Sequence, residues 1–153
     1  MASRAGLNRE ADILVKADTQ LPAEAFDACK CVLVDEAQFL SPQVIDQLRD
    51  IATQRRIPVI CFGLRTDFRS QLFEGSKRLF EVADSIEEVK TTCAFCNKKA
   101  VFNLKSVDGT PTIAGPQVAL GTEELYLPTC PNCYFDKLSL YSTELATELD
   151  RSN

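Results

Sequence analysis

The segment that decides the fold is CVLVDE at residues 31–36, and its counterpart is PVICFG at residues 58–63. Both begin as short runs of apolar and β-branched residues, which predicts strands buried on both faces. Between them, Ser41 suits a helix N-cap and Pro42 suits the first helical position. Apolar residues then recur on one helical face: Val44, Ile45, Leu48, Ile51 and Ala52. Residues 31–62 therefore predict strand, helix and strand, the unit of a parallel α/β sheet.

Polar residues follow both predicted strands. Ligands of a parallel sheet bind beyond the carboxyl ends of its strands, here Asp35-Glu36 and residues 63–65. An apolar strand that ends in Asp-Glu is similar to a Walker B element, where the Asp lies near a phosphate-bound Mg²⁺ and the Glu can act as a base. A solvated acid that starts a loop is the plainer alternative. The phosphate-binding sequence G-x-x-x-x-G-K-[ST] does not occur, because none of the six glycines precedes a Lys.

Four of the seven cysteines form two Cys-x-x-Cys pairs. They are Cys93, Cys96, Cys130 and Cys133. Each pair forms a tight turn, and the 33-residue loop between the pairs can bring both turns around one ion. Four protein thiolates leave no open position, so the predicted ion is a structural Zn²⁺, with two disulfides or a redox pair as the alternatives. We expect Cys29, Cys31 and Cys61 to be small buried core residues.

Composition excludes several classes of function. The chain has no His, which rules out Ser-His-Asp triads, His general bases and imidazole-ligated zinc. The net charge of −5 disfavours nucleic-acid binding, including that of a zinc ribbon, and Lys98, Lys99 and Lys105 are most simply a solvated face. The longest apolar runs are far shorter than the roughly 20 residues of a membrane span, and the N-terminus lacks a signal-peptide pattern, so we expect a cytoplasmic protein without a membrane partner.

The sequence indicates three parts. Residues 1–90 read as an α/β core, and residues 91–135 as a smaller zinc-binding module with a turn at Asp108-Gly109. Residues 136–153 read as a C-terminal helix or tail. This helix is predicted by apolar residues at helical spacing: Tyr134, Leu138, Tyr141, Leu145 and Leu149.

Several motifs occur together and in order: VLVDEAQF at residues 32–39, GLRTDFR at 63–69 with Phe73 and Gly75, and the two Cys pairs around Asp108-Gly109. From Ser3 to Tyr134 the chain resembles the type II thymidine kinases of bacteria and animals. The resemblance implies a P-loop-kinase-like parallel sheet with a small zinc-binding lasso domain. It also implies thymidine and ATP as substrates, Mg²⁺ with the ATP, a structural Zn²⁺, a homotetramer and a role in nucleotide salvage for DNA synthesis.

Carried over by position, the resemblance makes Glu36 the general base that takes the proton from the thymidine 5′-hydroxyl. The segment that contacts the nucleotide corresponds to Asp35, Glu36, Ala37 and Gln38, with Asp35 beside the Mg²⁺–ATP phosphates. The thymine pocket corresponds to Phe39, Leu64, Phe68 and Phe73. The lasso over the base corresponds to Gln117, Val118, Ala119, Leu120 and Gly121, with Tyr126 over the sugar. Packing in a core is the plainer alternative for Phe68, Phe73 and Tyr126.

The chain departs from the family at its start. Members begin with a strand, a P-loop and a helix, whereas this sequence begins after that part. We therefore expect an N-terminally truncated form of a full enzyme, which lacks the first strand of the sheet and should not bind ATP productively as it stands. The competing function is a non-catalytic, zinc-stabilised nucleoside-binding or interaction fragment.

Overall fold

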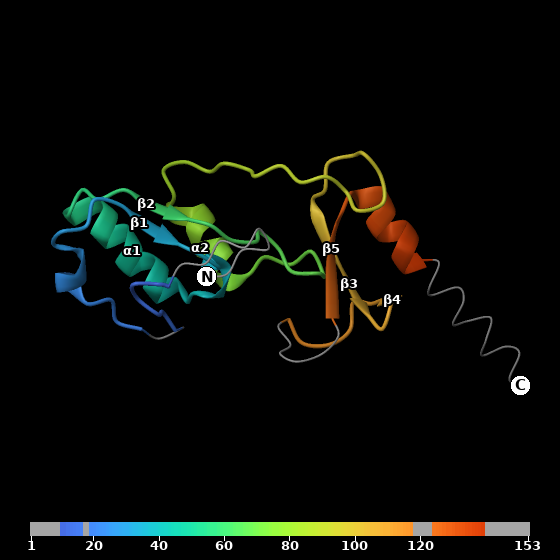
Figure 1. Ribbon diagram of the computed structural model, residues 1–153, viewed down its shortest axis with the longest axis horizontal. Coiled ribbons are helices and arrows are strands. Elements are labelled where there is room, and N and C mark those ends of the chain that lie inside the picture. The colour runs from blue at the N-terminus through green and yellow to red at the C-terminus, as the bar shows by residue number, and fades with distance from the viewer. Residues whose placement is uncertain (1–9, 17–18, 118–123, 140–153) are drawn as a thin grey trace, which may run out of the picture. The chain divides into compact units, whose positions relative to one another are not determined.

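The computed structural model describes residues 10–16, 19–117 and 124–139 (Figure 1). The chain forms two compact units: Met1–Gly63 with Glu74–Val82, and Leu64–Phe73 with Ala83–Asn153. The functional division at residues 90 and 135 stays a prediction. Over the described ranges, every helix is too short or too polar to cross a membrane.

The first unit contains the predicted strand, helix and strand. Its elements are η1 (Ala23–Phe26), β1 (Val32–Val34), η2 (Ala37–Phe39), α1 (Pro42–Gln54), β2 (Val59–Cys61) and α2 (Glu74–Val82). The strands pair in parallel, with Val32 opposite Val59 and Val34 opposite Cys61 (Figure 1). The α/β class and the parallel pairing are therefore confirmed for these two strands.

Helix α1 begins where the sequence predicts. The Ser41 side chain accepts a hydrogen bond from the Val44 amide at 3.4 Å, and Pro42 occupies the first turn, where its missing N–H costs nothing. The buried residues of the helix are Val44, Ile45, Leu48 and Ile51. Val44, Ile45 and Leu48 form one core cluster with Ala37 and Leu40, while Ile51 forms a second cluster with Phe26 and Ile57.

The prediction that both strands are buried on both faces is wrong. Leu33 remains 68% exposed and its partner Ile60 47% exposed. Side chains alternate between the two faces of a sheet, so only one face of each strand contacts the core formed with α1. That face carries Val32, Val34, Val59 and Cys61.

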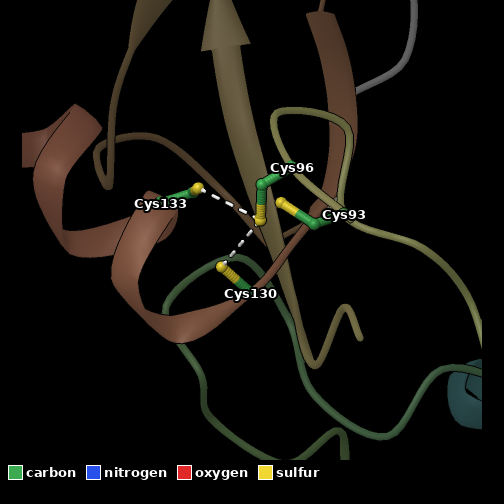
Figure 2. Close-up of side chains that lie close together, drawn as sticks. All are labelled: Cys93, Cys96, Cys130 and Cys133. Carbon is green, nitrogen blue, oxygen red and sulfur yellow. Dashed lines mark hydrogen bonds between the residues drawn. The ribbon is translucent and has the colours of Figure 1, made fainter. Parts of the chain in front are cut away.

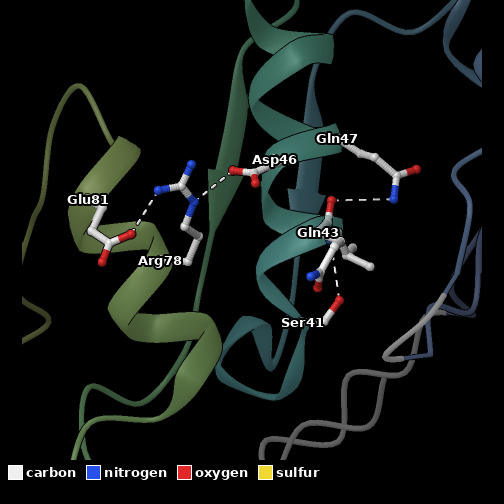
Figure 3. Close-up of polar contacts among 7 residues, drawn as sticks. Ser41, Gln43, Asp46, Gln47, Arg78 and Glu81 are labelled. Atoms are coloured by element: carbon white, nitrogen blue, oxygen red, sulfur yellow. Dashed lines mark hydrogen bonds and ion pairs between the residues drawn. The ribbon is translucent and has the colours of Figure 1, made fainter.

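Helices α1 and α2 are joined by a charged pair. Arg78 of α2 donates from Nε to Asp46 of α1 at 2.7 Å and from Nη1 to Glu81 at 2.8 Å (Figure 3). All three side chains are partly exposed, so solvent screens these ion pairs and their contribution to stability is small. They orient α2 along α1 while the apolar contacts of Leu79 and Val82 hold it to the core.

The second unit contains a three-stranded antiparallel sheet in the order β4-β3-β5. Its strands are β3 (Phe102–Val107), β4 (Thr110–Pro111) and β5 (Glu124–Thr129). Asp108 and Gly109 connect β3 to β4 with φ angles of 50° and 79°, as a type I′ hairpin turn requires. The turn predicted from Asp-Gly is confirmed.

A helix over residues 131–139 follows β5. It begins between the two cysteines of the second pair, Cys130 and Cys133. Tyr134 is buried and Leu138 is half-buried, as their helical spacing predicts. The Tyr134 ring packs against that of Phe102 of β3, with centroids 5.0 Å apart and the ring planes tilted by 41°. The other residues of the predicted apolar face, Tyr141, Leu145 and Leu149, lie outside the described residues.

The three unpaired cysteines are less buried than predicted. Cys31 is exposed, whereas Cys29 and Cys61 are only half-buried. Cys31 lies just before β1, and the Cys29 thiol donates to the Cys31 carbonyl oxygen at 3.0 Å. The prediction that all three are core residues is therefore wrong.

Candidate functional site

The acidic residues after β1 lie beside the end of β2. The Phe62 amide donates to the Val34 carbonyl at 2.8 Å, and the Ala37 amide donates back to the Phe62 carbonyl at 2.9 Å. Parallel strands that end together form the edge where α/β proteins bind ligands. Asp35 and Glu36 are both exposed at this edge and are available to a ligand.

Glu36 has an unusual backbone and a held side chain. Its φ of 52° is left-handed, which costs a non-glycine residue about 1 kcal/mol. The Gln38 amide donates to Glu36 Oε2 at 2.6 Å. Because Gln38 is only 2% exposed, its own orientation is fixed by packing, and it fixes one carboxylate oxygen of Glu36.

Two glycines allow this arrangement. A methyl group at Gly63 would lie 2.6 Å from Gln38 Oε1, so a larger residue there would displace the Gln38 side chain. A methyl group at Gly75 would lie 2.5 Å from the Ala37 carbonyl oxygen and 2.6 Å from that of Leu40. The start of α2 thus contacts the backbone of η2 directly. Nothing in the sequence pattern indicated either contact or the bond between Gln38 and Glu36.

The second unit brings together the four cysteines that the sequence predicts as metal ligands (Figure 2). Their sulfur atoms all lie within 4.8 Å of one another. The Cys96 sulfur is 3.6 Å from that of Cys130 and 3.8 Å from that of Cys133. Zinc–sulfur bonds of about 2.3 Å in a tetrahedron separate the sulfurs by about 3.8 Å. The thiols are free rather than disulfide-bonded, and their spacing fits one tetrahedral Zn²⁺.

The protonation of these thiols also favours a cation. Burial raises the pKa of Cys93, but hydrogen bonds with Cys130, Phe95 and Cys96 together outweigh it and lower that pKa to about 6. The hydrogen bond with Cys130, followed by burial, raises the pKa of Cys133 to about 12. Neighbouring thiols that hydrogen-bond to one another divide their pKa values in this way, because one keeps its proton and donates it to the others. A divalent cation removes the conflict by stabilising all four thiolates.

Phe68 is the most enclosed of the predicted thymine-pocket residues. Its side chain is 2% exposed, and its ring lies 4.8 Å from the Lys105 ammonium and 5.0 Å from the Arg69 guanidinium carbon. The Tyr126 ring is 6.3 Å away, and the Tyr134 hydroxyl donates to the Phe68 carbonyl. Burial raises the pKa of that hydroxyl, so Tyr134 stays a proton donor at neutral pH.

The other predicted site residues differ in exposure. Phe73 is 5% exposed, whereas Phe39 and Leu64 are each 47% exposed and Tyr126 is 40% exposed. Gln117 is described and its side chain contacts Asp67, but Val118, Ala119, Leu120 and Gly121 lie outside the described residues.

Lys105 corrects a further prediction. The sequence assigned it to a solvated face with Lys98 and Lys99, and those two are exposed. Lys105 instead is 1% exposed, because it points to the inner side of β3, opposite Tyr126, where it covers the Phe68 ring. A single Lys in a strand of mixed residues carried no signal of burial.

Comparison with known proteins identifies the family. A family model described as "Thymidine kinase" matches residues 1–134. A thymidine kinase of Lactiplantibacillus plantarum is 48% identical over 138 residues, which cover 88% of this chain and 71% of the relative. A thymidine kinase of Lactococcus lactis is 41% identical over 141 residues, covering 88% and 72%. One of Streptococcus pyogenes serotype M28 is 41% identical over 139 residues, covering 89% and 73%.

The match includes the acidic strand end, the segment around Phe68 and all four cysteines. These parts of the two units carry the exposed carboxylates, the enclosed aromatic ring and the close group of four thiols. This chain belongs to the thymidine kinase family.

Proposed function

We propose that this chain acts in the ATP-dependent phosphorylation of thymidine to its 5′-monophosphate, in the salvage of deoxynucleotides for DNA synthesis. The observation that carries the proposal is the family match over residues 1–134, supported by the relatives named as thymidine kinases. The exposed Asp-Glu pair follows β1 beside the end of the parallel strand β2, which supports a phosphoryl-transfer site at this edge.

Glu36 is the general base in this proposal. The 5′-hydroxyl must lose a proton as it attacks the γ-phosphorus, and a chain without His has carboxylates as its best bases near neutral pH. Gln38 holds one Glu36 oxygen and leaves the other for the substrate hydroxyl. Asp35 offers an exposed carboxylate, the oxygen ligand that Mg²⁺ prefers, and would hold the ion whose charge neutralises the phosphates.

Thymidine binding is assigned to aromatic and apolar residues and to the predicted lasso. Within the second unit, the buried Phe68 and Phe73 are assigned the rigid part of the pocket, while Leu64 and Tyr126 retain exposed surface for the ligand. Phe39 of the first unit is assigned to thymidine by the resemblance alone. The backbone of residues 117–121 is proposed to read the pyrimidine edge. Zn²⁺ on the four cysteines supports this function structurally, because it closes the 33-residue loop that carries the lasso.

The 153 residues contain no G-x-x-x-x-G-K-[ST] sequence, so we propose no measurable kinase activity for them alone. Phosphoryl transfer depends on an amide and Lys cradle that positions the phosphates. Joined to the P-loop segment that the resemblance implies, taken from the Lactiplantibacillus plantarum relative, the chain should transfer phosphate. Cytoplasmic location and a homotetramer are further proposals from the resemblance.

Two measurements test the proposal. Titration calorimetry of the 153-residue chain should show binding of thymidine and none of adenosine, and a coupled assay should show thymidine-dependent ADP release by the joined chain only. Binding without any ADP release in the joined chain would favour the alternative, a zinc-stabilised nucleoside-binding fragment. Absence of both would contradict a role with thymidine altogether.

A further inference from the structure

Two segments far apart in sequence are tied together within the second unit. Arg69 donates from Nε to the Ile113 carbonyl at 3.1 Å and from its terminal nitrogen to the Gly115 carbonyl. The Gln117 amide donates to Asp67 Oδ2 at 3.2 Å. The bonded residues are 44 to 50 positions apart in the sequence. On the segment 113–117, the bonded residues alternate: Ile113, Gly115 and Gln117.

Asp67 is placed to act as the fixed end of this connection. Asp67 is only 4% exposed. Its Oδ1 accepts hydrogen bonds from the backbone amides of Arg69 and Gln71, both at 2.9 Å. One carboxylate oxygen therefore holds the turn of its own loop, while the other receives Gln117. A buried carboxylate with three donors is rigid, and its hydrogen bonds are charge-assisted.

We propose that Asp67 and Arg69 are positioning residues that hold residues 113–117, the chain leading into the predicted lasso. In this account the Gln117 side chain serves the clamp rather than the base of the substrate, and only its backbone remains for recognition. The clamp sets where the lasso starts, and thereby the affinity for the nucleoside. This consequence for binding rests on the proposed function, whereas the clamp itself does not.

The Asp67–Gln117 contact can be tested with one variant that breaks it and a double variant that restores it. In Gln117→Glu, a carboxylate would face a carboxylate at hydrogen-bond distance, so the contact becomes repulsive. In the double variant Asp67→Asn with Gln117→Glu, the Asn amide can donate to the new carboxylate, while the Asn oxygen still accepts the amides of Arg69 and Gln71. Asp67→Asn alone should change little, because Gln117 can flip its amide and accept from Asn.

The measurement is hydrogen exchange of backbone amides in residues 112–117 of the full 153-residue chain. We expect exchange about 10-fold faster in Gln117→Glu, and recovery to within about 3-fold of the unsubstituted chain in the double variant, because a charge-assisted bond of this kind is lost and then restored. Arg69→Met should also accelerate exchange. Arg65→Met is the matched control. It removes the same charge from the same loop, but Arg65 donates to the Val101 carbonyl and not to residues 113–117.

Unchanged exchange in Gln117→Glu, or equal acceleration in that variant and the double variant, would overturn the proposal. Thymidine affinity, measured by calorimetry on the same proteins, should follow the exchange rates, with a dissociation constant about 10-fold higher in Gln117→Glu. If the unsubstituted chain binds no thymidine, the proposed function fails, but the exchange result still decides whether the clamp exists.

Discussion

Replacing Gly75 by Ala tests whether the contact between α2 and η2 is as close as the structure shows. Helix propensity alone predicts that this change stabilises α2 by about 1 kcal/mol, because Gly is the poorer helix former. The new methyl group, however, would lie 2.5 Å from the Ala37 carbonyl oxygen, 2.6 Å from that of Leu40 and 2.9 Å from that of Gln38. These three neighbours are backbone atoms, which cannot rotate away.

Overpacking of this kind costs about 1–3 kcal/mol, and with rigid neighbours we take the upper half of that range. Subtracting the propensity gain leaves a net loss of about 1–2 kcal/mol in the free energy of unfolding. Urea denaturation followed by circular dichroism measures it, with Lys77→Ala as the matched control. Lys77 is exposed in the same helix, so Ala should be neutral there. Stabilisation by Gly75→Ala would refute the close approach of α2 to η2.

Three further predictions concern the metal, a thiol and Mg²⁺. Elemental analysis after dialysis should give one Zn²⁺ per chain. Cys93→Ser should lower the zinc content and increase proteolysis within residues 97–117 before the first unit unfolds. Zinc-free protein with an intact loop would contradict the metal assignment. Burial raises the pKa of Cys61 to about 11, so at pH 9 only about 1% of Cys61 is thiolate, against about 50% of a thiol of pKa 9.0. Iodoacetamide should therefore modify Cys61 about 50-fold more slowly than that reference thiol. Equal rates of modification would argue against the burial of Cys61. Asp35→Asn, in the chain joined to a P-loop segment, should raise the Mg²⁺ concentration needed for half-maximal turnover while thymidine affinity stays within about 2-fold, and an unchanged Mg²⁺ dependence would remove Asp35 from the metal site.

The sequence predicts the local elements well because their signals are local. Ser41 and Pro42 mark the start of α1, and the Asp108-Gly109 pair marks a turn that needs two positive φ angles. The zinc ligands are equally predictable, since two Cys-x-x-Cys pairs leave few alternatives and the four sulfurs do gather.

The burial of strands and single side chains is less predictable, because it depends on what covers them. An apolar triplet such as Val32–Val34 reads as buried on both faces, yet in the structure Leu33 is exposed and only its neighbours contact the core. Lys105 reads as solvated and is enclosed. Both outcomes are set by segments distant in sequence, which a local pattern does not contain.

The same reason limits what the sequence says of the site. The family resemblance assigns Glu36 to the reaction and Phe68 to the thymine pocket, and these assignments stay proposals. The residues that hold them, Gln38 for the carboxylate and Asp67 for the loop around Phe68, act through hydrogen bonds that only the folded chain reveals. Neither partner would be chosen from spacing alone.

Turnover of Glu36→Gln tests the central claim most directly. The joined chain, with the P-loop segment of the Lactiplantibacillus plantarum relative, is assayed for thymidine-dependent ADP release with and without this substitution. Gln keeps the shape of the side chain and its contact with Gln38 but cannot accept the proton, so kcat should fall about 10²–10⁴-fold while thymidine binding stays within about 3-fold. Near-full turnover with intact thymidine binding would contradict the account, because Glu36 would then not be the base.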